Sequence, residues 1–389
     1  NNVFRVAEND GSPTGQFVDL VEQLDIEGKI DPPLSNDPQE KTDEIVAMAE
    51  WLLGRDMPND WKLSGMPNSA PILIRRVPEQ DENFLPTVGI RDPHCAGRRN
   101  AQGDNIPPSL EQFSVEAWDT TSGGGLQDHY DYAEAVLVGD DFGILHGFHY
   151  DSGNELFGFV PLALLNNSRK LSMGDSALFG QDDELQSHVF GIASTVNAGW
   201  AWDEDAETWR HLAVFGMGPG GSEIITLDIS HMGRLQTDDP VEVVWTTTTT
   251  NNSQDYADTL GETWSRPALT YAVPNDSMLL EPKAYMVFGS GYSEGVGGPE
   301  RGRTVWVVDA MTGETVTQKA LTEAPDPDTI YDVEADYAAV GDVAVASHCL
   351  SRYWGEMQEA YWADPAGRLF RWDIAAASLD VESFPHNSD

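Results

Sequence analysis

The stretch Val136–Val160, VLVGDDFGILHGFHYDSGNELFGFV, holds three short apolar runs separated by two turns. The turns, Asp140-Asp141-Phe142-Gly143 and Asp151-Ser152-Gly153-Asn154, have the composition of tight β-hairpins, because Gly and Asn tolerate the positive φ that such turns require. The stretch therefore predicts one antiparallel meander. Its three strands are expected over Val136–Gly139, Ile144–Tyr150 and Glu155–Val160.

The same three-run pattern returns three more times along the chain, at a spacing of roughly 40 to 50 residues that is typical of propeller blades. The expected strands are His211–Phe215, Glu223–Ile229 and Val241–Thr246, then Ala284–Phe288, Thr304–Asp309 and Thr315–Lys319, then Ala360–Trp362, Arg368–Ile374 and Leu379–Ser383, with less regular strands near Ile72, Val189–Ala198 and Ala338–Ser347. The sequence predicts an all-β fold, a modified β-propeller of antiparallel meanders with about seven blades. A stacked sandwich is the alternative, since hairpin patterns alone do not fix how meanders pack.

The first 60 residues differ from the rest. Apolar residues recur at helical spacing up to Gly28 and again from Thr42 or Asp43 to Gly54, with a Pro-rich loop over Asp31–Pro38 between them. We therefore expect a short helical lead-in over residues 1–60 and a propeller over residues 61–389. The polar, Gly/Pro-bearing stretch near 91–127 is expected to be an insertion carried on a blade.

The composition is strongly acidic, with 65 Asp and Glu against 22 Lys and Arg and a net charge of −43. A nucleic-acid partner is excluded because phosphate binding needs a cationic surface, and an anionic membrane surface is disfavoured for the same reason. Such acidity indicates a solvated surface, divalent cation binding or a basic partner. No run of eighteen apolar residues and no basic-then-apolar leader in Asn1–Val6 is present, so neither membrane insertion nor a retained signal peptide is expected.

Two glycine-rich stretches match the consensus of a nucleotide-binding motif and of a catalytic motif. Gly216–Gly221 matches G-x-G-x-x-G, but an apolar β-like run follows where a dinucleotide site needs a helix. Gly291–Gly295 matches G-x-S-x-G, but Val296-Gly297-Gly298-Pro299 cannot continue as the helix of a nucleophile elbow. Both are better interpreted as hairpin loops, and no catalytic residue is predicted.

The only cysteines are Cys95 and Cys349, each next to a histidine, His94 and His348. In an oxidising compartment a disulfide between them would close a long loop and stabilise the fold by about 4 kcal/mol. Two buried thiols are the alternative, and a Cys/His metal site is a third and weaker one. His146 and His149 lie three apart in one expected strand and point to opposite faces, so they cannot chelate one metal as a pair.

Calcium is the stronger inorganic candidate, because carboxylate-rich loops offer hard oxygen ligands. Asp203–Glu207 starts like an acidic loop but lacks the sharp-turn Gly and the late Glu of a calcium loop. The cluster Asp326, Asp328, Asp332, Glu334 and Asp336 also lacks that spacing. Both are better interpreted as solvated turns, and no firm cofactor is predicted.

Seven blocks of sequence resemble the C-terminal propeller of the type IV pilus tip adhesin and assembly factor family, the PilY-like proteins. They are Leu63–Pro71, Val138–Phe148, Phe159–Leu165, Trp209–Gly221 continuing to Leu227–Ile229, Leu260–Pro267, Phe288–Tyr292 and Gly367–Ile374. The resemblance spans roughly residues 60–375. It implies an exported, non-enzymatic, modified seven-bladed propeller at the pilus tip, extracellular after passage through the periplasm. Its implied partners are minor pilins and a host or abiotic surface ligand.

The chain departs from that family in one respect that bears on calcium. Members often carry an Asp-x-Asp-x-Asp-Gly type loop before the last blade, whereas this chain has Ser347–Glu356 there, SHCLSRYWGE. Calcium binding through that loop is therefore not implied for this chain, and no ligand residue carries over. The large N-terminal adhesive region usual in the family is also not in this sequence, which is expected to be a fragment or a reduced member.

Two functions of other classes stay open beside the pilus function. A quinoprotein-type dehydrogenase that uses pyrroloquinoline quinone is built from similar blades, and it would need a calcium ion, a stacking Trp and a catalytic Asp in the central funnel. A secreted carbohydrate-binding propeller unrelated to pili is the second. Cofactor uptake with alcohol oxidation would indicate the first, and retention on glycans without minor pilins the second.

Overall fold

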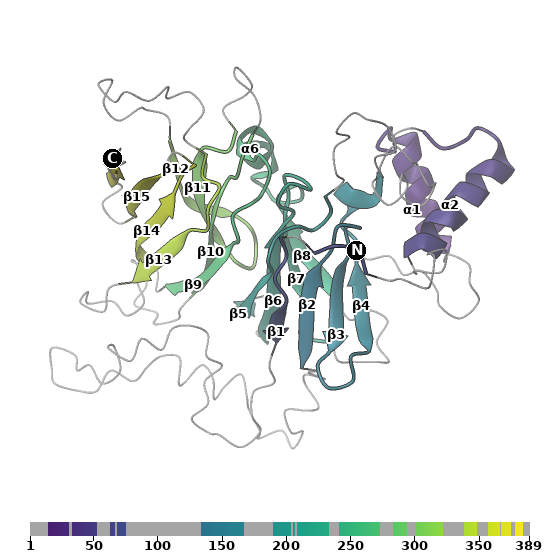
Figure 1. Ribbon diagram of the computed structural model, residues 1–389, viewed down its shortest axis with the longest axis horizontal. Helices are drawn as coiled ribbons and strands as arrows, with labels where there is room; N and C mark the ends of the chain where they lie inside the picture. Colours follow the sequence, from purple (N-terminus) through teal and green to yellow (C-terminus); the bar gives the residue numbers. More distant parts are fainter. Residues whose placement is uncertain are drawn as a thin grey trace, which may run out of the picture.

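The computed structural model describes residues 15–30, 33–52, 63–66, 68–74, 134–166, 190–203, 205–206, 208–232, 241–272, 283–293, 301–321, 338–347, 357–365, 367–374 and 378–383. The described residues are mostly β and form four four-stranded antiparallel sheets, each with its strands paired in chain order. Figure 1 shows the sheets following one another from the helical side to the C-terminal side of the molecule.

The strands confirm the predicted meanders to within a few residues. The first sheet contains β1 (Ile72–Ile74), β2 (Ala135–Gly139), β3 (Leu145–His149) and β4 (Glu155–Phe159), and the second contains β5 (Asn197–Asp203), β6 (Thr208–Gly216), β7 (Ile224–Asp228) and β8 (Glu242–Thr246). The third contains β9 (Ala268–Ala272), β10 (Lys283–Gly289), β11 (Thr304–Asp309) and β12 (Thr315–Ala320), and the fourth contains β13 (Ala344–Ser347), β14 (Met357–Ala363), β15 (Arg368–Asp373) and β16 (Ser378–Ser383).

Two of the less regular strands begin later than expected: the strand expected over Val189–Ala198 is wrong over residues 190–196, and the one over Ala338–Ser347 is wrong over residues 338–343. Residues 190–196 form a connector, and the strand β5 starts at Asn197. The connector has strand-like composition because Ile192 and Val196 are buried in the core between the first two sheets. Burial of an irregular segment therefore produced the apolar signal that favoured a strand.

The hairpin turns repeat the same geometry in different sheets. In the β2–β3 turn the amide of Gly143 donates to the Asp140 carbonyl at 3.1 Å, and in the β14–β15 turn the amide of Gly367 donates to the Asp364 carbonyl at 3.0 Å. Each aspartate also accepts, through Oδ1, the amide four residues later at 2.9 Å. Both glycines have positive φ, +85° and +80°, which side chains rarely adopt. The positive φ predicted at Gly143 is confirmed.

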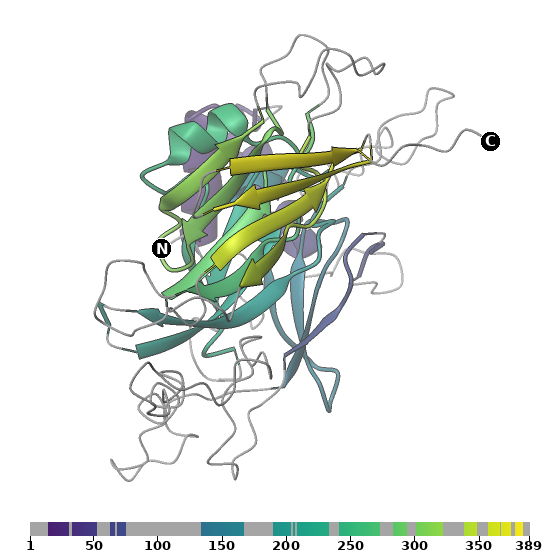
Figure 2. The same ribbon diagram turned by 90° about the vertical axis from the view of Figure 1, so that its left-hand side faces the viewer.

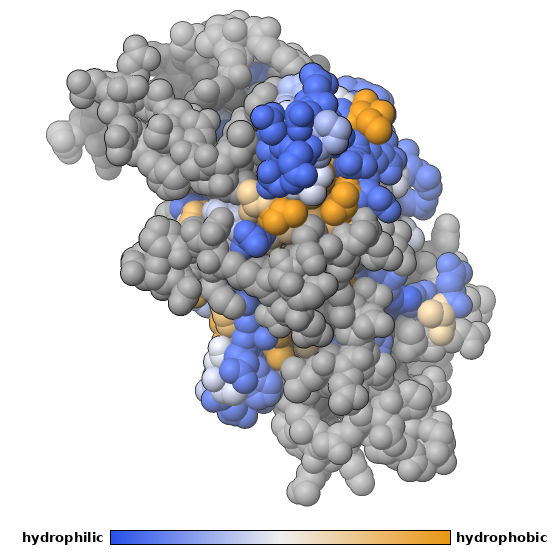
Figure 3. All heavy atoms as spheres, turned by 90° about the vertical axis from the view of Figure 1, so that its right-hand side faces the viewer, coloured by the Kyte–Doolittle hydropathy of each residue, from blue (hydrophilic) through white to orange (hydrophobic). Residues whose placement is uncertain are grey.

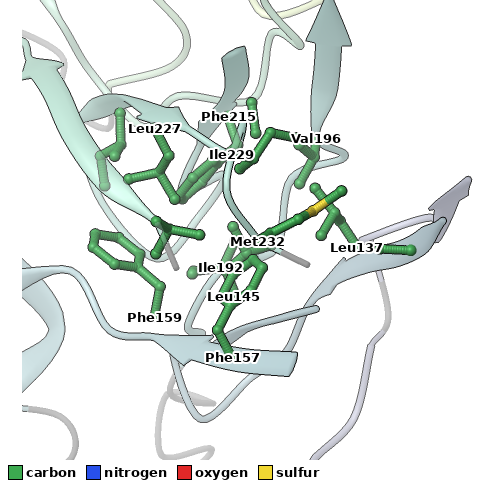
Figure 4. Packing of buried hydrophobic residues seen from close by; sticks show 14 of the residues in the cluster. Leu137, Leu145, Phe157, Phe159, Ile192, Val196, Phe215, Leu227, Ile229 and Met232 are labelled. Carbon is green, nitrogen blue, oxygen red and sulfur yellow. The ribbon is translucent and has the colours of Figure 1, made fainter. Parts of the chain in front are cut away.

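Each inner sheet buries both of its faces. In β10, Met286 and Phe288 face the second sheet, whereas Tyr285 and Val287 face the fourth, as the alternation of side chains along a strand requires. Three apolar clusters lie between successive sheets, and Figure 4 shows the one between the first and second. Figure 2 shows the C-terminal sheet stacked over the third. Face-to-face stacking, rather than edge pairing, therefore holds the sheets together.

Two helices, α1 (Gly15–Ile26) and α2 (Pro38–Leu52), pack on each other beside the first sheet (Figure 1). Trp51 contacts Phe142 of the β2–β3 turn, with ring centroids 4.9 Å apart. The helix expected from Thr42 or Asp43 begins earlier, at Pro38, because the Asp37 carboxylate accepts the amides of Gln39 and Glu40 at 2.9 and 3.2 Å. Figure 3 shows that most described side chains on this side of the molecule are hydrophilic.

Two short helical elements lie in the connections between sheets. The 3-10 helix η2 (Leu162–Leu164) follows β4, and α6 (Ser253–Thr259) follows β8. The sequence did not predict α6, whose Tyr256 is buried and contacts Trp306 of the third sheet at 4.7 Å between ring centroids. Among the described residues, no helix is long and apolar enough to cross a membrane. The domain boundary at residue 60 and the insertion near 91–127 stay predictions, since residues 53–62 and 75–133 lie outside the described part.

Candidate functional site

At one end of each of the first three sheets, the loop that follows the second strand meets the connector that leads to the next sheet. Together these loops and connectors form a rim. We call residues 139–144, 190–196, 216–223, 260–267, 289–293 and 338–343 the rim loops. Each of the first three sheets ends its second strand in a glycine against which the next connector lies. The pairs are Gly139 with Ile192, Gly216 with Thr263 and Gly289 with Ala339, and each partner lies five residues before the first strand of the next sheet.

Backbone hydrogen bonds run from one rim loop to the next. The donors and acceptors are Ile192 N to Asp140 O at 2.9 Å, Ala193 N to Met217 O at 3.2 Å, Gly218 N to Thr263 O at 3.1 Å, Gly261 N to Ser290 O at 2.9 Å and Gly291 N to Ala339 O at 3.0 Å. Together they join all four sheets at one rim through main-chain atoms. A rim fixed in this way can hold exposed side chains in defined positions.

The rim loops present two exposed aromatic side chains, Trp264 and Tyr292, which are 36% and 37% exposed. The indole Nε1 of Trp264 donates to Glu262 Oε2 at 2.8 Å. Glu262 and Tyr292 pair as an antiparallel bridge. Exposed aromatic side chains supply contact area at low entropic cost.

A buried polar cluster lies under the rim in the first sheet. His146 is 2% exposed, and its Nδ1 lies 2.6 Å from Glu155 Oε1 while its Nε2 lies 3.4 Å from Asp140 Oδ2. The same Asp140 oxygen accepts the amide of Ser64 at 3.1 Å. The cluster therefore connects the β2–β3 turn, strand β4 and the segment before β1.

Electrostatics favour the charged form of His146. Burial lowers the pKa of this imidazole, but its hydrogen bonds and charge interactions with Asp140 and Glu155 outweigh that effect and raise the pKa to about 9. At neutral pH His146 is therefore an imidazolium held between two carboxylates. Its ring also stacks on Phe148, with centroids 5.6 Å apart. The geometry describes a structural ion-pair cluster, because each ring nitrogen already has a carboxylate partner.

The position of His146 in the third strand of its sheet differs from the equivalent position in the other sheets, which are aligned by the register of their second and third strands. The residues at the position of His146 in the other three sheets are Ile225, Trp306 and Phe370, all buried in the inter-sheet clusters. His146 faces away from the second sheet, where no other described sheet packs. His146 and His149 lie in one strand, β3, as predicted, whereas the ion pairs of His146 were not predicted. The hairpin register would have indicated the ion pair with Glu155, because it places Glu155 of β4 opposite Phe148 of β3, which lies on the same face as His146.

The second buried histidine behaves in the opposite way. His211 in β6 is 5% exposed, and burial lowers its pKa to about 3. Its backbone amide donates to Ser230 Oγ at 2.8 Å. His211 is therefore neutral in the folded protein over the physiological range.

The first glycine-rich stretch is a loop between strands, as predicted, and the described part of the second follows the end of a strand. Residues 216–223 connect β6 to β7, so a strand follows where a dinucleotide site needs a helix. Gly291, Tyr292 and Ser293 follow β10, and Gly291 has a φ of +87°. Residues 294–300 lie outside the described part of the chain.

Of the acidic stretch Asp203–Glu207, the described residues Asp205 and Ala206 lie in a turn that Asp203 closes. Asp203 Oδ1 accepts the amides of Asp205 and Ala206 at 3.0 and 3.1 Å, and its Oδ2 lies 2.7 Å from Arg210 Nε. Within the described ranges, no group of three or more His, Cys, Asp or Glu side chains is arranged to hold a metal ion. The second acidic cluster, at 326–336, lies outside them.

The predicted disulfide between Cys95 and Cys349 also lies outside the described residues, as do His94 and His348. The disulfide, the alternative of two buried thiols and the Cys/His site therefore stay predictions. The same holds for the stretch 348–356, where the family's calcium loop is replaced in this sequence.

Comparison with known proteins supports the resemblance found in the sequence. The chain is 26% identical over 310 residues to the "Type IV pilus biogenesis factor PilY1 homolog" of Xylella fastidiosa, a match that covers 79% of this chain and 18% of the relative. It is 24% identical over 218 residues to the "Type IV pilus biogenesis factor PilY1" of Pseudomonas aeruginosa, covering 54% of this chain and 16% of the relative. No family model matches the chain.

Among solved structures, the chain is similar to the Pseudomonas aeruginosa PilY1 C-terminal domain, at 21% identity and a TM-score of 0.41 over 62% of this chain and 39% of that one. The recognised resemblance to PilY1-type proteins is therefore confirmed by sequence similarity. The chain spans less than a fifth of the length of the two curated relatives.

Proposed function

We propose that this chain is the propeller part of a type IV pilus biogenesis factor that supports pilus assembly and surface adhesion from the pilus tip. The observation that carries the proposal is the sequence similarity to two pilus biogenesis factors, which covers 79% of this chain in one case. Pilus biogenesis is the function of the full-length relatives, and we propose that this chain contributes to it.

We further propose that the four sheets are successive blades of one closed propeller with about seven blades. Three features support this: the sheets stack in chain order, each has four antiparallel strands, and each connector crosses the second strand of the sheet before it. Successive sheets are in direct contact, so additional blades would come from segments outside the four described sheets. Radial closure would place a further blade against the outer faces of the first and fourth sheets, on which no other described sheet packs.

The proposed role is non-enzymatic binding. A rim fixed by main-chain hydrogen bonds and an acidic surface suit contact with protein partners, for which we propose minor pilins. The buried histidine with a raised pKa, His146, is engaged by Asp140 and Glu155 and has a structural explanation. We propose that the protein acts outside the cell, at the pilus tip or cell surface after export, where it also meets a host or abiotic surface ligand.

Deletion of the coding region in the bacterium that encodes the protein tests the proposal. We expect fewer surface pili and weaker attachment, both restored by the wild-type gene and by the control variant Gly158→Ala, in which the added methyl group makes only ordinary contacts of 3.4 Å or more. Unchanged piliation and attachment in a deletion strain shown to lack the protein would contradict it.

A cofactor assay separates the enzymatic alternative. If pyrroloquinoline quinone with calcium bound tightly to the purified chain and alcohol oxidation followed, the chain would be an enzyme and the proposed non-enzymatic role would be wrong. We expect no saturable change in the absorption spectrum of the quinone.

A further inference from the structure

The exposed aromatic side chains of the rim lie on two segments that pair with each other. Glu262 N donates to Tyr292 O at 2.6 Å, and Tyr292 N donates to Glu262 O at 3.0 Å. Directly opposed residues in an antiparallel pair project to the same side. The side chains of Glu262 and Tyr292 therefore lie on one side of this short ribbon.

Trp264 joins them through its side chain. Its indole N–H donates to the Glu262 carboxylate at 2.8 Å, which holds ring and carboxylate side by side. We call Glu262, Trp264 and Tyr292 the aromatic rim patch. Trp264 and Tyr292 are each more than a third exposed, so both residues can be reached by a ligand.

Two glycines fix the backbone under the patch. A Cβ on Gly261 would collide with the Tyr292 carbonyl, and a Cβ on Gly291 would collide with the Glu262 carbonyl. Gly291 also has a φ of +87°, which favours glycine. The close approach of the two segments thus depends on these residues, and it sets the aromatic rim patch before any partner arrives, which lowers the entropic cost of binding.

Charge selects the kind of ligand. The chain has a net charge of −43, and the patch itself carries the Glu262 carboxylate. The neighbouring Arg266 faces Asp342 at 3.5 Å, so its charge is matched within the protein. Arg301 is exposed on the segment that leads to β11, and the next residue, Gly302, lies against Gly291 and Tyr292, so Arg301 would repel a cationic ligand at Tyr292.

We propose that the aromatic rim patch binds an arginine or lysine side chain of a protein partner. The cation would lie over the face of Trp264 or Tyr292, within about 6 Å of the ring centroid, where the quadrupole of the ring attracts it. Glu262 would supply the opposite charge. A sugar ligand is less well matched, because a sugar needs several hydrogen-bonding groups around the ring and the patch offers one carboxylate. This inference does not depend on the proposed pilus function.

The test uses the 389-residue chain labelled with 5-fluorotryptophan. The Trp264 resonance is assigned from its loss in the Trp264→Phe variant. The probe is the peptide acetyl-Gly-Arg-Gly-Arg-Gly-amide, and its citrulline analogue is the neutral control of equal shape. We expect a saturable shift of the Trp264 resonance with the arginine peptide and no saturable shift with citrulline.

Variants locate the site. Glu262→Gln keeps an acceptor for the indole and removes the charge, so we expect binding at least threefold weaker, as for Tyr292→Ala. Arg301→Gln should bind more tightly. The matched controls Tyr150→Ala and Asp151→Asn lie in the β3–β4 turn, where Tyr150 is 54% exposed and Asp151 is also exposed, and should bind like the wild type.

Three results would overturn the inference. The first is a Trp264 resonance that does not move, or moves equally with citrulline. The second is an equal loss in the Asp151→Asn control, which would show attraction by overall charge alone. The third is a shift with maltose or cellobiose but not with arginine, which would make the patch a sugar site. Circular dichroism of each variant confirms that a loss of binding is not a loss of folding.

Discussion

Replacing Gly289 with alanine tests how the sheets are joined. Gly289 ends β10, and a Cβ there would lie 2.9 Å from the carbonyl carbon of Ala339 and closer still to its oxygen. The Ala339 carbonyl accepts the amide of Gly291 at 3.0 Å, so it cannot turn away without weakening that bond. We therefore expect the third and fourth sheets to shift apart at the rim.

The size of the effect follows from three terms. Overpacking costs about 1–3 kcal/mol, and a weakened buried hydrogen bond adds about 1 kcal/mol. Alanine also lowers the conformational entropy of the unfolded chain, which stabilises the folded protein by about 0.4–1 kcal/mol. The free energy of unfolding of Gly289→Ala should therefore be lower than that of the wild type by about 1–4 kcal/mol.

The assay is urea unfolding followed by circular dichroism, with Gly158→Ala as the matched control. Gly158 lies in β4, and a Cβ there would come no closer than 3.4 Å to Ile144. We expect this control to differ from the wild type by less than about 0.5 kcal/mol. If Gly289→Ala matched the control, the connector at Ala339 would not cross the end of β10 and the reasoning would fail.

Four other substitutions probe turn, charge and packing. Gly143→Val should lower the free energy of unfolding by more than 1 kcal/mol by the same assay, because φ is +85° there and Leu164 lies 3.0 Å from the added Cβ. The pKa of His146 is about 9 in the folded protein against an ordinary 6.5, so charged His146 stabilises the fold fully below pH 6.5. This stabilisation, at most about 3 kcal/mol, is lost as the pH rises through 9. The urea midpoint of His146→Phe should not fall over that pH range. The pKa of His211 is lowered to about 3, so stability should fall as pH drops below 6.5, and His211→Gln should reduce that fall. Tyr256→Phe should cost about 1–3 kcal/mol in thermal or urea unfolding, because the Gly313 carbonyl loses the hydroxyl that donates to it at 2.9 Å.

Controls distinguish these effects from general damage. His149→Asn changes the neighbouring histidine of β3 and should leave the fall between pH 6.5 and 9 intact. A wild-type stability that did not change over that range would contradict the ion pairs of His146. For Gly143, an unchanged urea midpoint would show that the turn accepts a β-branched residue. For Tyr256, a midpoint equal to that of the wild type would show that its hydroxyl adds nothing to the packing of α6 on the third sheet.

Local chemistry made the meanders predictable. Gly143 and Gly153 have positive φ, +85° and +69°, as the Asp/Gly turn composition predicted. The strands on either side were also found, because tight turns restrict pairing to neighbouring segments. The connectors were harder, since residues 190–196 look apolar for a tertiary reason, the burial of Ile192 and Val196.

The candidate site was less predictable than the fold. Asp140, His146 and Glu155 come together only through the register of two hairpins and the burial of one sheet face. Trp264 and Tyr292 come together through pairing between two irregular loops about thirty residues apart, which no local pattern encodes. The glycines that permit this approach were visible in the sequence, but their partners, the carbonyl groups of another loop, were not.

The most direct test of the pilus function is to identify what this protein associates with in the cell. Sheared and purified type IV pili from the native bacterium, examined by mass spectrometry after mild crosslinking, should contain peptides of this chain linked to minor pilins. A strain lacking the minor pilins should release the chain from the pilus fraction. Pili that carry no trace of the chain, while it is present elsewhere in the same culture, would contradict the account.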